Sequence, residues 1–134
     1  MRWTVAVAAS LWLAGCTNFS EPSCPAGLKE MTQADLYFGR NIGNAPGVSD
    51  EDWRRFVDEE ITQGFPNGLT VQDASGQWRG AGGTIVREAS KHLSILLAGA
   101  PDDADKLAAI REAYKLRFRQ EAVLLLETKS CGSF

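Results

Sequence analysis

The chain has 134 residues, of which 44% are hydrophobic, and this suits one globular domain rather than a disordered chain. Its 17 acidic residues outnumber 14 basic ones, so the net charge at pH 7 is −3. The basic residues form no block. The sequence therefore lacks the positive surface that nucleic-acid binding requires, and we expect no nucleic-acid partner.

The first fifteen residues have the pattern of an export signal. Arg2 gives a positive start, and residues 3–14 carry no charge. This apolar segment is shorter than the ~20 residues of a membrane-spanning helix but matches the core of a signal peptide. We therefore expect residues 1–15 to be removed from the mature protein.

A short motif at the end of this segment, Leu13-Ala14-Gly15-Cys16, resembles the lipobox of bacterial lipoproteins. The resemblance implies that Cys16 becomes the first mature residue and carries acyl chains such as palmitate, which anchor the protein in a membrane. By similarity to enterobacterial lipoproteins, Thr17 after the cysteine favours the outer membrane, facing the periplasm, over the inner membrane. The alternative is a secreted protein cleaved nearby, with Cys16 free or paired.

Two further cysteines lie near opposite ends of the remaining chain. Outside the cytoplasm, an oxidising environment makes a disulfide between Cys24 and Cys131 plausible. Closing a loop of ~100 residues would stabilise the fold by roughly 4–5 kcal/mol in the chain-entropy model. The alternative is two unrelated thiols. There is no Cys-x-x-Cys pair and no histidine–cysteine cluster, so we expect no metal site and no cofactor.

Residues 16–33 contain prolines, a glycine and small polar side chains, and they predict a tether. Residues 34–42 alternate in polarity and predict a strand with Leu36 and Phe38 on one face. Residues 41–48 carry two glycines, two asparagines and a proline, and predict a loop.

A helix is expected to begin at Ser49, whose hydroxyl can accept a backbone hydrogen bond, with Asp52 at the capping-box position. Gly64 and Pro66 end it. Its apolar stripe consists of Trp53, Phe56, Val57 and Ile61.

Two strands are predicted next. The first covers residues 69–79 with a turn or bulge at 74–76, and the second covers 84–97 with a bulge near 88–90. The glycine-rich turn at 80–83 lacks the Lys-Ser/Thr end of a phosphate-binding loop, so a hairpin connection is favoured. In the second strand one face is expected to hold Leu93, Ile95 and Leu97, and the other Glu88, Ser90, His92 and Ser94.

A second helix is expected from Pro101, and residues 122–128 predict a final strand. The core stripe of this helix consists of Leu107, Ile110, Tyr114 and Phe118. The order β-α-β-β-α-β predicts a ferredoxin-like α+β sandwich over residues 34–134, with two helices on one face of a four-stranded antiparallel sheet.

Several short motifs run along this domain in a fixed order. They are Leu36-Tyr37-Phe38-Gly39-Arg40, Trp53 with Phe56, Phe65-Pro66-Asn67-Gly68-Leu69-Thr70, Gly76-Gln77-Trp78-Arg79, Ile85-Val86-Arg87-Glu88 with Ser90-Lys91, and Ala113-Tyr114-Lys115 with Phe118. Together they resemble a bacterial domain family of unknown function, number 3574 in that series. The resemblance covers Leu36 to Phe134. It implies the extent and class of the domain and supplies no catalytic residue.

The candidate functional residues are expected on the sheet face away from the helices. A carboxylate and an imidazole there, Glu88 and His92, could perform acid–base chemistry, although such groups are also common on solvated or subunit-covered faces. Trp78 and Arg79 beside Tyr37 could form an aromatic and cationic contact patch. Structurally, Trp78 could simply cover the sheet and Arg79 pair with Glu88. No nucleophile–base arrangement is compelling, so no catalytic residue is assigned.

These patterns favour a non-enzymatic, lipid-anchored module of the bacterial cell envelope. It would bind a protein or a small ligand through the open sheet face, as a homodimer or with an envelope protein partner. The alternative is a small cofactor-free enzyme in which two domains enclose a pocket using Tyr37, Arg79, Glu88 and His92. A closed pocket lined by these four groups would favour the enzyme, and a flat or protein-covered face would favour binding.

Overall fold

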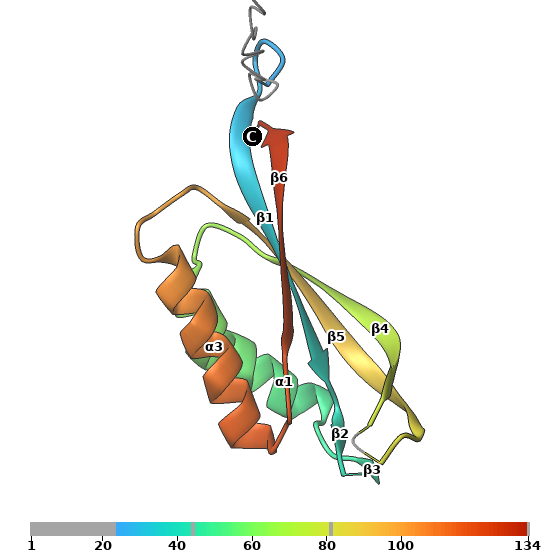
Figure 1. The fold of residues 1–134 in the computed structure, drawn as a ribbon. Coiled ribbons are helices and arrows are strands. Elements are labelled where there is room, and N and C mark those ends of the chain that lie inside the picture. The colour runs from blue at the N-terminus through green and yellow to red at the C-terminus, as the bar shows by residue number, and fades with distance from the viewer. Residues whose placement is uncertain (1–23, 44, 81, 134) are drawn as a thin grey trace, which may run out of the picture.

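The structure is a computed structural model that describes residues 24–43, 45–80 and 82–133. Four long strands form one antiparallel sheet in the order β4-β5-β1-β6. They are β1 (Lys29–Gly39), β4 (Thr70–Arg79), β5 (Ile85–Leu97) and β6 (Leu124–Gly132). Both helical segments lie on one side of this sheet (Figure 1). The predicted ferredoxin-like α+β sandwich is therefore confirmed. The predicted signal peptide and Cys16 lie outside the described residues.

The first strand begins at Lys29, earlier than the predicted start at Ala34. Its first residues pair with the end of β6, from Lys29 opposite Gly132 onward, so the last part of the predicted tether belongs to the sheet. The predicted disulfide is confirmed, because Cys24 and Cys131 are joined just beyond this pairing. The start of β1 and the end of β6 thus lie side by side (Figure 1).

The segment after β1 is not the irregular loop that the sequence predicted. It contains a small two-stranded ribbon of β2 (Asn41–Ile42) and β3 (Ala45–Pro46). The carbonyl oxygen of Arg40 accepts hydrogen bonds from the N–H groups of Gly47 and Val48, both at 3.0 Å. These contacts fold the ribbon back beside the end of β1.

The first helical segment begins where the sequence predicted. The Ser49 hydroxyl accepts the Asp52 N–H at 3.0 Å and donates to the Asp52 carboxylate at 2.6 Å, which caps α1 (Asp50–Phe56). The segment continues through a π turn, η1 (Val57–Ile61), into α2 (Thr62–Gly64). Since a π turn takes up one additional residue, Ile61 rather than Glu60 meets the core.

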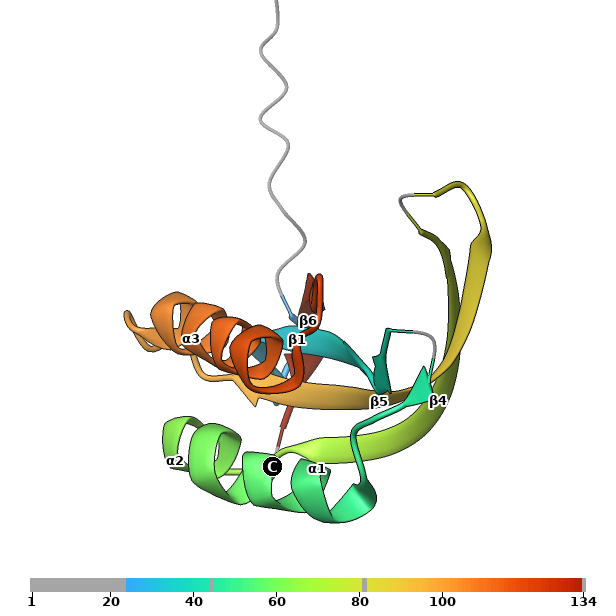
Figure 2. The ribbon, with the colours of Figure 1, turned by 90° about the horizontal axis from the view of Figure 1, so that it is seen from below.

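The predicted turn at 74–76 and the predicted bulge near 88–90 are both wrong. β4 pairs with β5 in one uninterrupted register, from Thr70 opposite Ser94 to Arg79 opposite Ile85. β4 is an edge strand, and it is held mainly by its ladder of hydrogen bonds to β5. Small residues and glycine are therefore tolerated inside it. The far end of this hairpin curls away from the helices (Figure 2).

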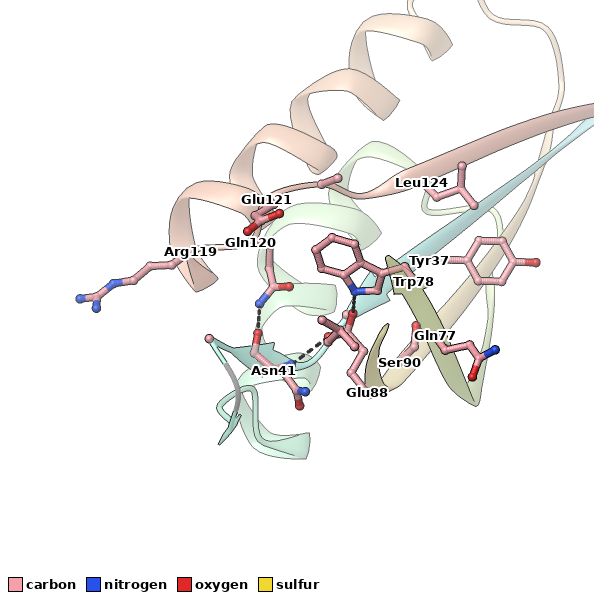
Figure 3. A pocket seen from close by; sticks show the side chains of 15 residues that line it. Tyr37, Asn41, Gln77, Trp78, Glu88, Ser90, Arg119, Gln120, Glu121 and Leu124 are labelled. Atoms are coloured by element: carbon pink, nitrogen blue, oxygen red, sulfur yellow. Dashed lines mark hydrogen bonds between the residues drawn. The ribbon is translucent and has the colours of Figure 1, made fainter. Parts of the chain in front are cut away.

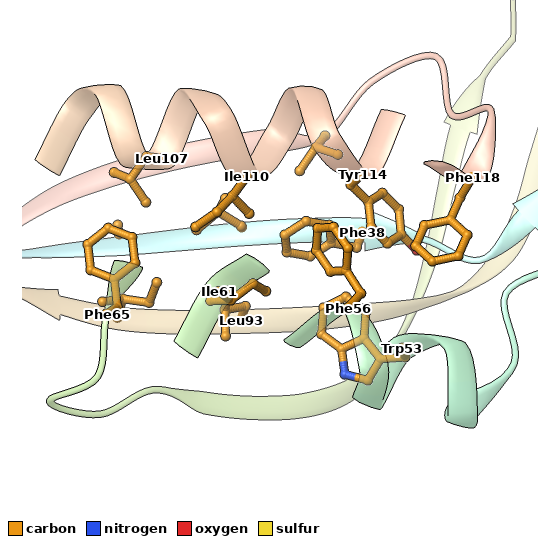
Figure 4. Packing of buried hydrophobic residues seen from close by; sticks show 14 of the residues in the cluster. Phe38, Trp53, Phe56, Ile61, Phe65, Leu93, Leu107, Ile110, Tyr114 and Phe118 are labelled. Carbon is orange, nitrogen blue, oxygen red and sulfur yellow. The ribbon is translucent and has the colours of Figure 1, made fainter. Parts of the chain in front are cut away.

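The core lies between the helices and the sheet, and both predicted helical stripes contribute to it. α3 (Asp103–Phe118) buries Leu107, Ile110, Tyr114 and Phe118. Aromatic rings from β1, α1 and α3 form one cluster in which the centroids of Phe56 and Tyr114 are 5.1 Å apart (Figure 4). The expected core face of the sheet is also confirmed, since Leu36, Phe38, Leu93 and Ile95 are buried and Leu69 and Val71 pack against them. Within the described ranges no helix is long and apolar enough to cross a membrane.

Candidate functional site

The sheet face opposite the helices brings together residues from all four strands. Tyr37 lies directly opposite His92, and Gly39 lies opposite Ser90. The rings of Tyr37 and His92 are stacked, with centroids 4.6 Å apart and planes 7° from parallel. Because cross-strand partners point to the same face, Gln72 and Trp78 on β4 lie on this side too.

A pocket of about 460 Å³ lies at one end of this face, between the β4–β5 hairpin and the connection from α3 to β6 (Figure 3). Its volume falls within the range of small-molecule sites. Three of the five predicted surface residues, Tyr37, Trp78 and Glu88, line it. The remaining lining residues are Gly39, Asn41, Gly43, Gly76, Gln77, Val86, Ser90, Arg119, Gln120, Glu121, Ala122 and Leu124.

Both carboxylate oxygens of Glu88 in the pocket accept a hydrogen bond. One carboxylate oxygen accepts the indole N–H of Trp78 at 3.0 Å, and the other accepts the backbone N–H of Asn41 at 3.3 Å (Figure 3). The carboxylate also lies against Gly39. A Cβ atom at that position would be 2.6 Å from the Glu88 Oε2 atom, so only glycine leaves this space open.

Arg79 does not belong to the pocket. Adjacent strand residues point to opposite faces, so Arg79 is turned away from Trp78. Its guanidinium donates to the carbonyl oxygen of Gly83 at 3.2 Å, and the partner of Glu88 is Trp78 rather than Arg79. The fifth predicted residue, His92, lies behind Tyr37 and does not line the pocket.

His92 is held by two neighbours that the sequence analysis did not single out. Its Nε2 atom is 2.8 Å from an Asp35 carboxylate oxygen, and its Nδ1 atom is 3.3 Å from the Gln72 side-chain oxygen. Burial by itself would raise the pKa of Asp35, but hydrogen bonds from Gln33, His92 and Ser94 outweigh it and hold this pKa below its ordinary value of 3.8. The alternation of the strand could have revealed Asp35, because it is two residues before Tyr37.

The end of β1 that forms the pocket floor is held by two side-chain hydrogen bonds. From the core side, the Tyr114 hydroxyl donates to the carbonyl oxygen of Gly39 at 2.8 Å. From the pocket side, the Ser90 hydroxyl donates to the carbonyl oxygen of Phe38 at 3.1 Å. Burial raises the pKa of Tyr114 well above its usual range, so the phenol stays a donor at any physiological pH.

The rim near the end of α3 was also missed from the sequence. The Gln120 side chain donates to the carbonyl oxygen of Asn41 at 2.5 Å, which links the end of α3 to the β2–β3 ribbon. Arg119, which ends the helix, has a left-handed backbone conformation with φ of 53°. Glycine is the usual residue at such a position, so an arginine there does not indicate this turn.

Across residues 24–43, 45–80 and 82–133, no group of three or more histidine, cysteine, aspartate or glutamate side chains is arranged to hold a metal ion. The donors and acceptors of the pocket, together with its apolar wall of Trp78, Val86 and Leu124, suit an organic ligand.

Two kinds of protein with solved structures are similar to this chain in fold. A phage SAM lyase in complex with S-methyl-5'-thioadenosine has a TM-score of 0.63 at 21% identity, covering 78% of this chain and 90% of the lyase. CutA from Synechococcus elongatus has a TM-score of 0.53 at 13% identity, covering 81% of this chain and 87% of CutA. At these identities the likeness shows the fold alone.

A search of curated proteins found no match. The family model described as "Protein of unknown function (DUF3574)" matches residues 33–134, which include every residue of the pocket, and the chain therefore belongs to this family.

Proposed function

We propose that this protein is a lipid-anchored binding module of the bacterial cell envelope that holds a small ligand in the pocket beside Glu88. The observation that carries the proposal is the combination of a positioned carboxylate with an aromatic side chain that is still accessible. Trp78 donates its N–H to Glu88, yet 41% of its surface is exposed. An exposed tryptophan fixed by a hydrogen bond offers a ready contact surface at low entropic cost.

The geometry supports binding more than the enzyme alternative. That alternative requires one enclosed pocket lined by Tyr37, Arg79, Glu88 and His92. The pocket is open on one side, and neither Arg79 nor His92 lines it. The second candidate function is a SAM lyase activity with Glu88 in the site. It is suggested by the phage SAM lyase of similar fold, which was solved with S-methyl-5'-thioadenosine. Incubation of the purified protein with SAM, followed by chromatography for S-methyl-5'-thioadenosine, tests this second candidate.

The proposed location rests on the motif at Cys16 and on the disulfide. A disulfide between Cys24 and Cys131 suits a compartment outside the reducing cytoplasm. The lipid on Cys16 would hold the domain at a membrane, which we place at the outer membrane facing the periplasm. The first strand begins at Lys29, so a short segment would separate the domain from the lipid.

A protein partner or a second copy would dock on the remainder of the open sheet face. Leu124 and Leu126 on the edge strand β6 are 53% and 49% exposed on this side, and Leu96 of β5 is 45% exposed. Exposed apolar patches on a protein surface often mark sites of protein contact. Leu124 also lines the pocket and Leu126 follows it on the same face of β6, whereas Leu96 lies toward the other end of the sheet, opposite Gln33.

The binding proposal is tested by thermal shift with a chemically mixed library, using the full chain purified in detergent from bacterial membranes, and by native mass spectrometry of ligands that co-purify. We expect ligands that raise the melting temperature of the wild-type protein and lose this effect in Trp78→Ala. Leu116→Ala is the matched control, because Leu116 is 80% exposed on α3 and does not line the pocket. Absence of any stabilising or co-purifying compound would overturn the proposal.

The anchor is tested by Cys16→Ser. The wild-type protein should sediment with membranes and carry an acyl-modified N-terminus by mass spectrometry, whereas the variant should be soluble or remain unprocessed. Unchanged sedimentation and an unchanged acyl-modified mass in the variant would refute lipidation.

A further inference from the structure

Glu88 carries a negative charge into the pocket without a cationic partner. Among the described residues, no lysine or arginine nitrogen forms an ion pair with its carboxylate, although the side chain is half-buried. The carboxylate is held by two N–H groups and still reaches solvent, so its charge is available to a ligand that enters the pocket.

Three arginines near the pocket do not pair with Glu88. Arg40 pairs with Asp50 at 3.0 Å and donates to the carbonyl oxygen of Val48. Arg79 bonds to Gly83 on the other side of the hairpin. Arg119 lines the rim, but its side chain extends away from Trp78 and Glu88 (Figure 3).

The two hydrogen bonds of Glu88 leave its oxygens able to accept more. Trp78 donates to one oxygen and Asn41 to the other. A carboxylate oxygen accepts two hydrogen bonds, so each oxygen retains capacity for a ligand donor. Both partners are N–H donors, which orient the carboxylate without neutralising it.

The walls around this charge are mainly apolar or aromatic. Trp78 from β4, Val86 from β5 and Leu124 from β6 line the pocket together with Ala122. An ammonium group next to a carboxylate and a tryptophan ring gains from a charge-assisted hydrogen bond and from the electron-rich ring. A carboxylate or phosphate ligand would instead be repelled by Glu88.

We infer that the pocket binds an organic cation, an ammonium group joined to an apolar body, with Glu88 as its counter-ion and Trp78 beside it. This inference rests on the proposed binding function and names the class of ligand. The positive group replaces the cation that the protein does not supply, and the apolar body covers the wall formed by Val86 and Leu124.

The test compares three probes of similar size and different charge: benzylammonium, benzyl alcohol and benzoate. Each is titrated into the full chain in detergent, and the NMR signal of the Trp78 indole N–H reports binding. We expect benzylammonium to bind about tenfold more tightly than either other probe. In Glu88→Gln, which keeps an acceptor for Trp78 but removes the charge, this preference should vanish. The control Glu60→Gln, which changes an exposed helix residue outside the pocket, should keep it.

Equal binding of benzyl alcohol and benzylammonium would overturn the inference. A preference for the cation that persists in Glu88→Gln would also overturn it. Either result leaves the proposed binding function unaffected. Failure of all three probes to shift the Trp78 signal would also overturn it. In that case the library screen decides separately whether the pocket binds ligands of another class.

Discussion

The carboxylate of Glu88 occupies the space that a side chain at Gly39 would need. The two residues are far apart in sequence and meet because β1 and β5 are neighbours, with Gly39 opposite Ser90 and Glu88 two residues before Ser90 on β5. A Cβ atom at Gly39 would lie 2.6 to 2.8 Å from three atoms of the Glu88 carboxylate group. Because residue 39 is glycine, the Glu88 carboxylate can occupy this place in the pocket.

Gly39→Ala should displace the Glu88 carboxylate from Trp78 and Asn41. The end of a glutamate side chain can move, so the cost in free energy of unfolding should be only about 1 kcal/mol, the value of a hydrogen bond. Ligand binding should weaken much more. The informative measurement is a double-mutant cycle by urea unfolding, in which Gly39→Ala in a Glu88→Ala background becomes neutral or stabilising because alanine suits a strand better than glycine. An equal cost in both backgrounds would show that the two residues do not interact.

Arg119→Gly should stabilise the protein. Arg119 has φ of 53°, and side chains disfavour this conformation by about 1 kcal/mol relative to glycine. We expect the midpoint of urea denaturation to rise. The free energy of unfolding should increase by roughly 0.5–1 kcal/mol, because the entropy that glycine adds to the unfolded chain offsets part of the gain. Arg119→Ala is the control, because alanine keeps the conformational cost and should not stabilise. A gain of the same size in both variants would assign the effect to the arginine side chain.

Asp35 should make the stability of the fold sensitive to acid. Its pKa in the folded state lies below the ordinary 3.8, so its contribution is present above pH 3.8 and is lost as the pH falls through the folded-state value. Asp35→Asn should lower the free energy of unfolding by about 1–2 kcal/mol at pH 7, since hydrogen bonds to a charged group are lost. Below pH 3.8 the difference in free energy of unfolding between variant and wild type should shrink.

Urea unfolding over a pH series measures this difference for Asp35→Asn, with Asp58→Asn at an exposed position as control. A difference that stays constant with pH would contradict the assignment.

Loss of the disulfide should destabilise the domain without changing its topology. Cys24 and Cys131 are 107 residues apart in sequence, and opening a loop of this length costs about 4–5 kcal/mol in the chain-entropy model. We expect the Cys24→Ser/Cys131→Ser variant to unfold at lower urea, while its circular dichroism spectrum stays that of the wild type because β1 and β6 remain paired. A non-reducing peptide map of protein from the envelope should show the link directly. Free thiols at both positions there would refute it.

Much of the fold could be predicted because its signals are local. The alternation around Leu36 and Leu93 identified the buried face of two strands, and the Ser49 cap identified the start of a helix. Where the expectations were wrong, the deciding contacts were distant. Residues 29–33 form a strand because β6 pairs with them, and Ala74, Ser75 and Gly76 stay extended because β5 runs beside them without a break. Single-residue preference for a turn does not outweigh a complete ladder of hydrogen bonds.

The candidate site was predicted only in part for the same reason. Tyr37, Trp78 and Glu88 could be placed on the open face by strand periodicity. Periodicity could not show that Trp78 bonds to Glu88 while Arg79 turns away. It also could not show that Asn41 and Gln120 line the pocket. The contacts of all these residues depend on the curl of the hairpin and on the return of the chain after α3.

By itself, the sequence determined the order of the four long strands and two helical segments along the chain, their buried faces and the family, since helix and strand periods, caps and short motifs lie within a few neighbouring residues. The tertiary structure alone decided which groups meet. The carboxylate of Glu88 is positioned by a glycine from β1, a backbone N–H from the ribbon and an indole from β4. Those groups converge through the order of the strands in the sheet, which arises from the packing of the whole chain and is not encoded in any local stretch of it.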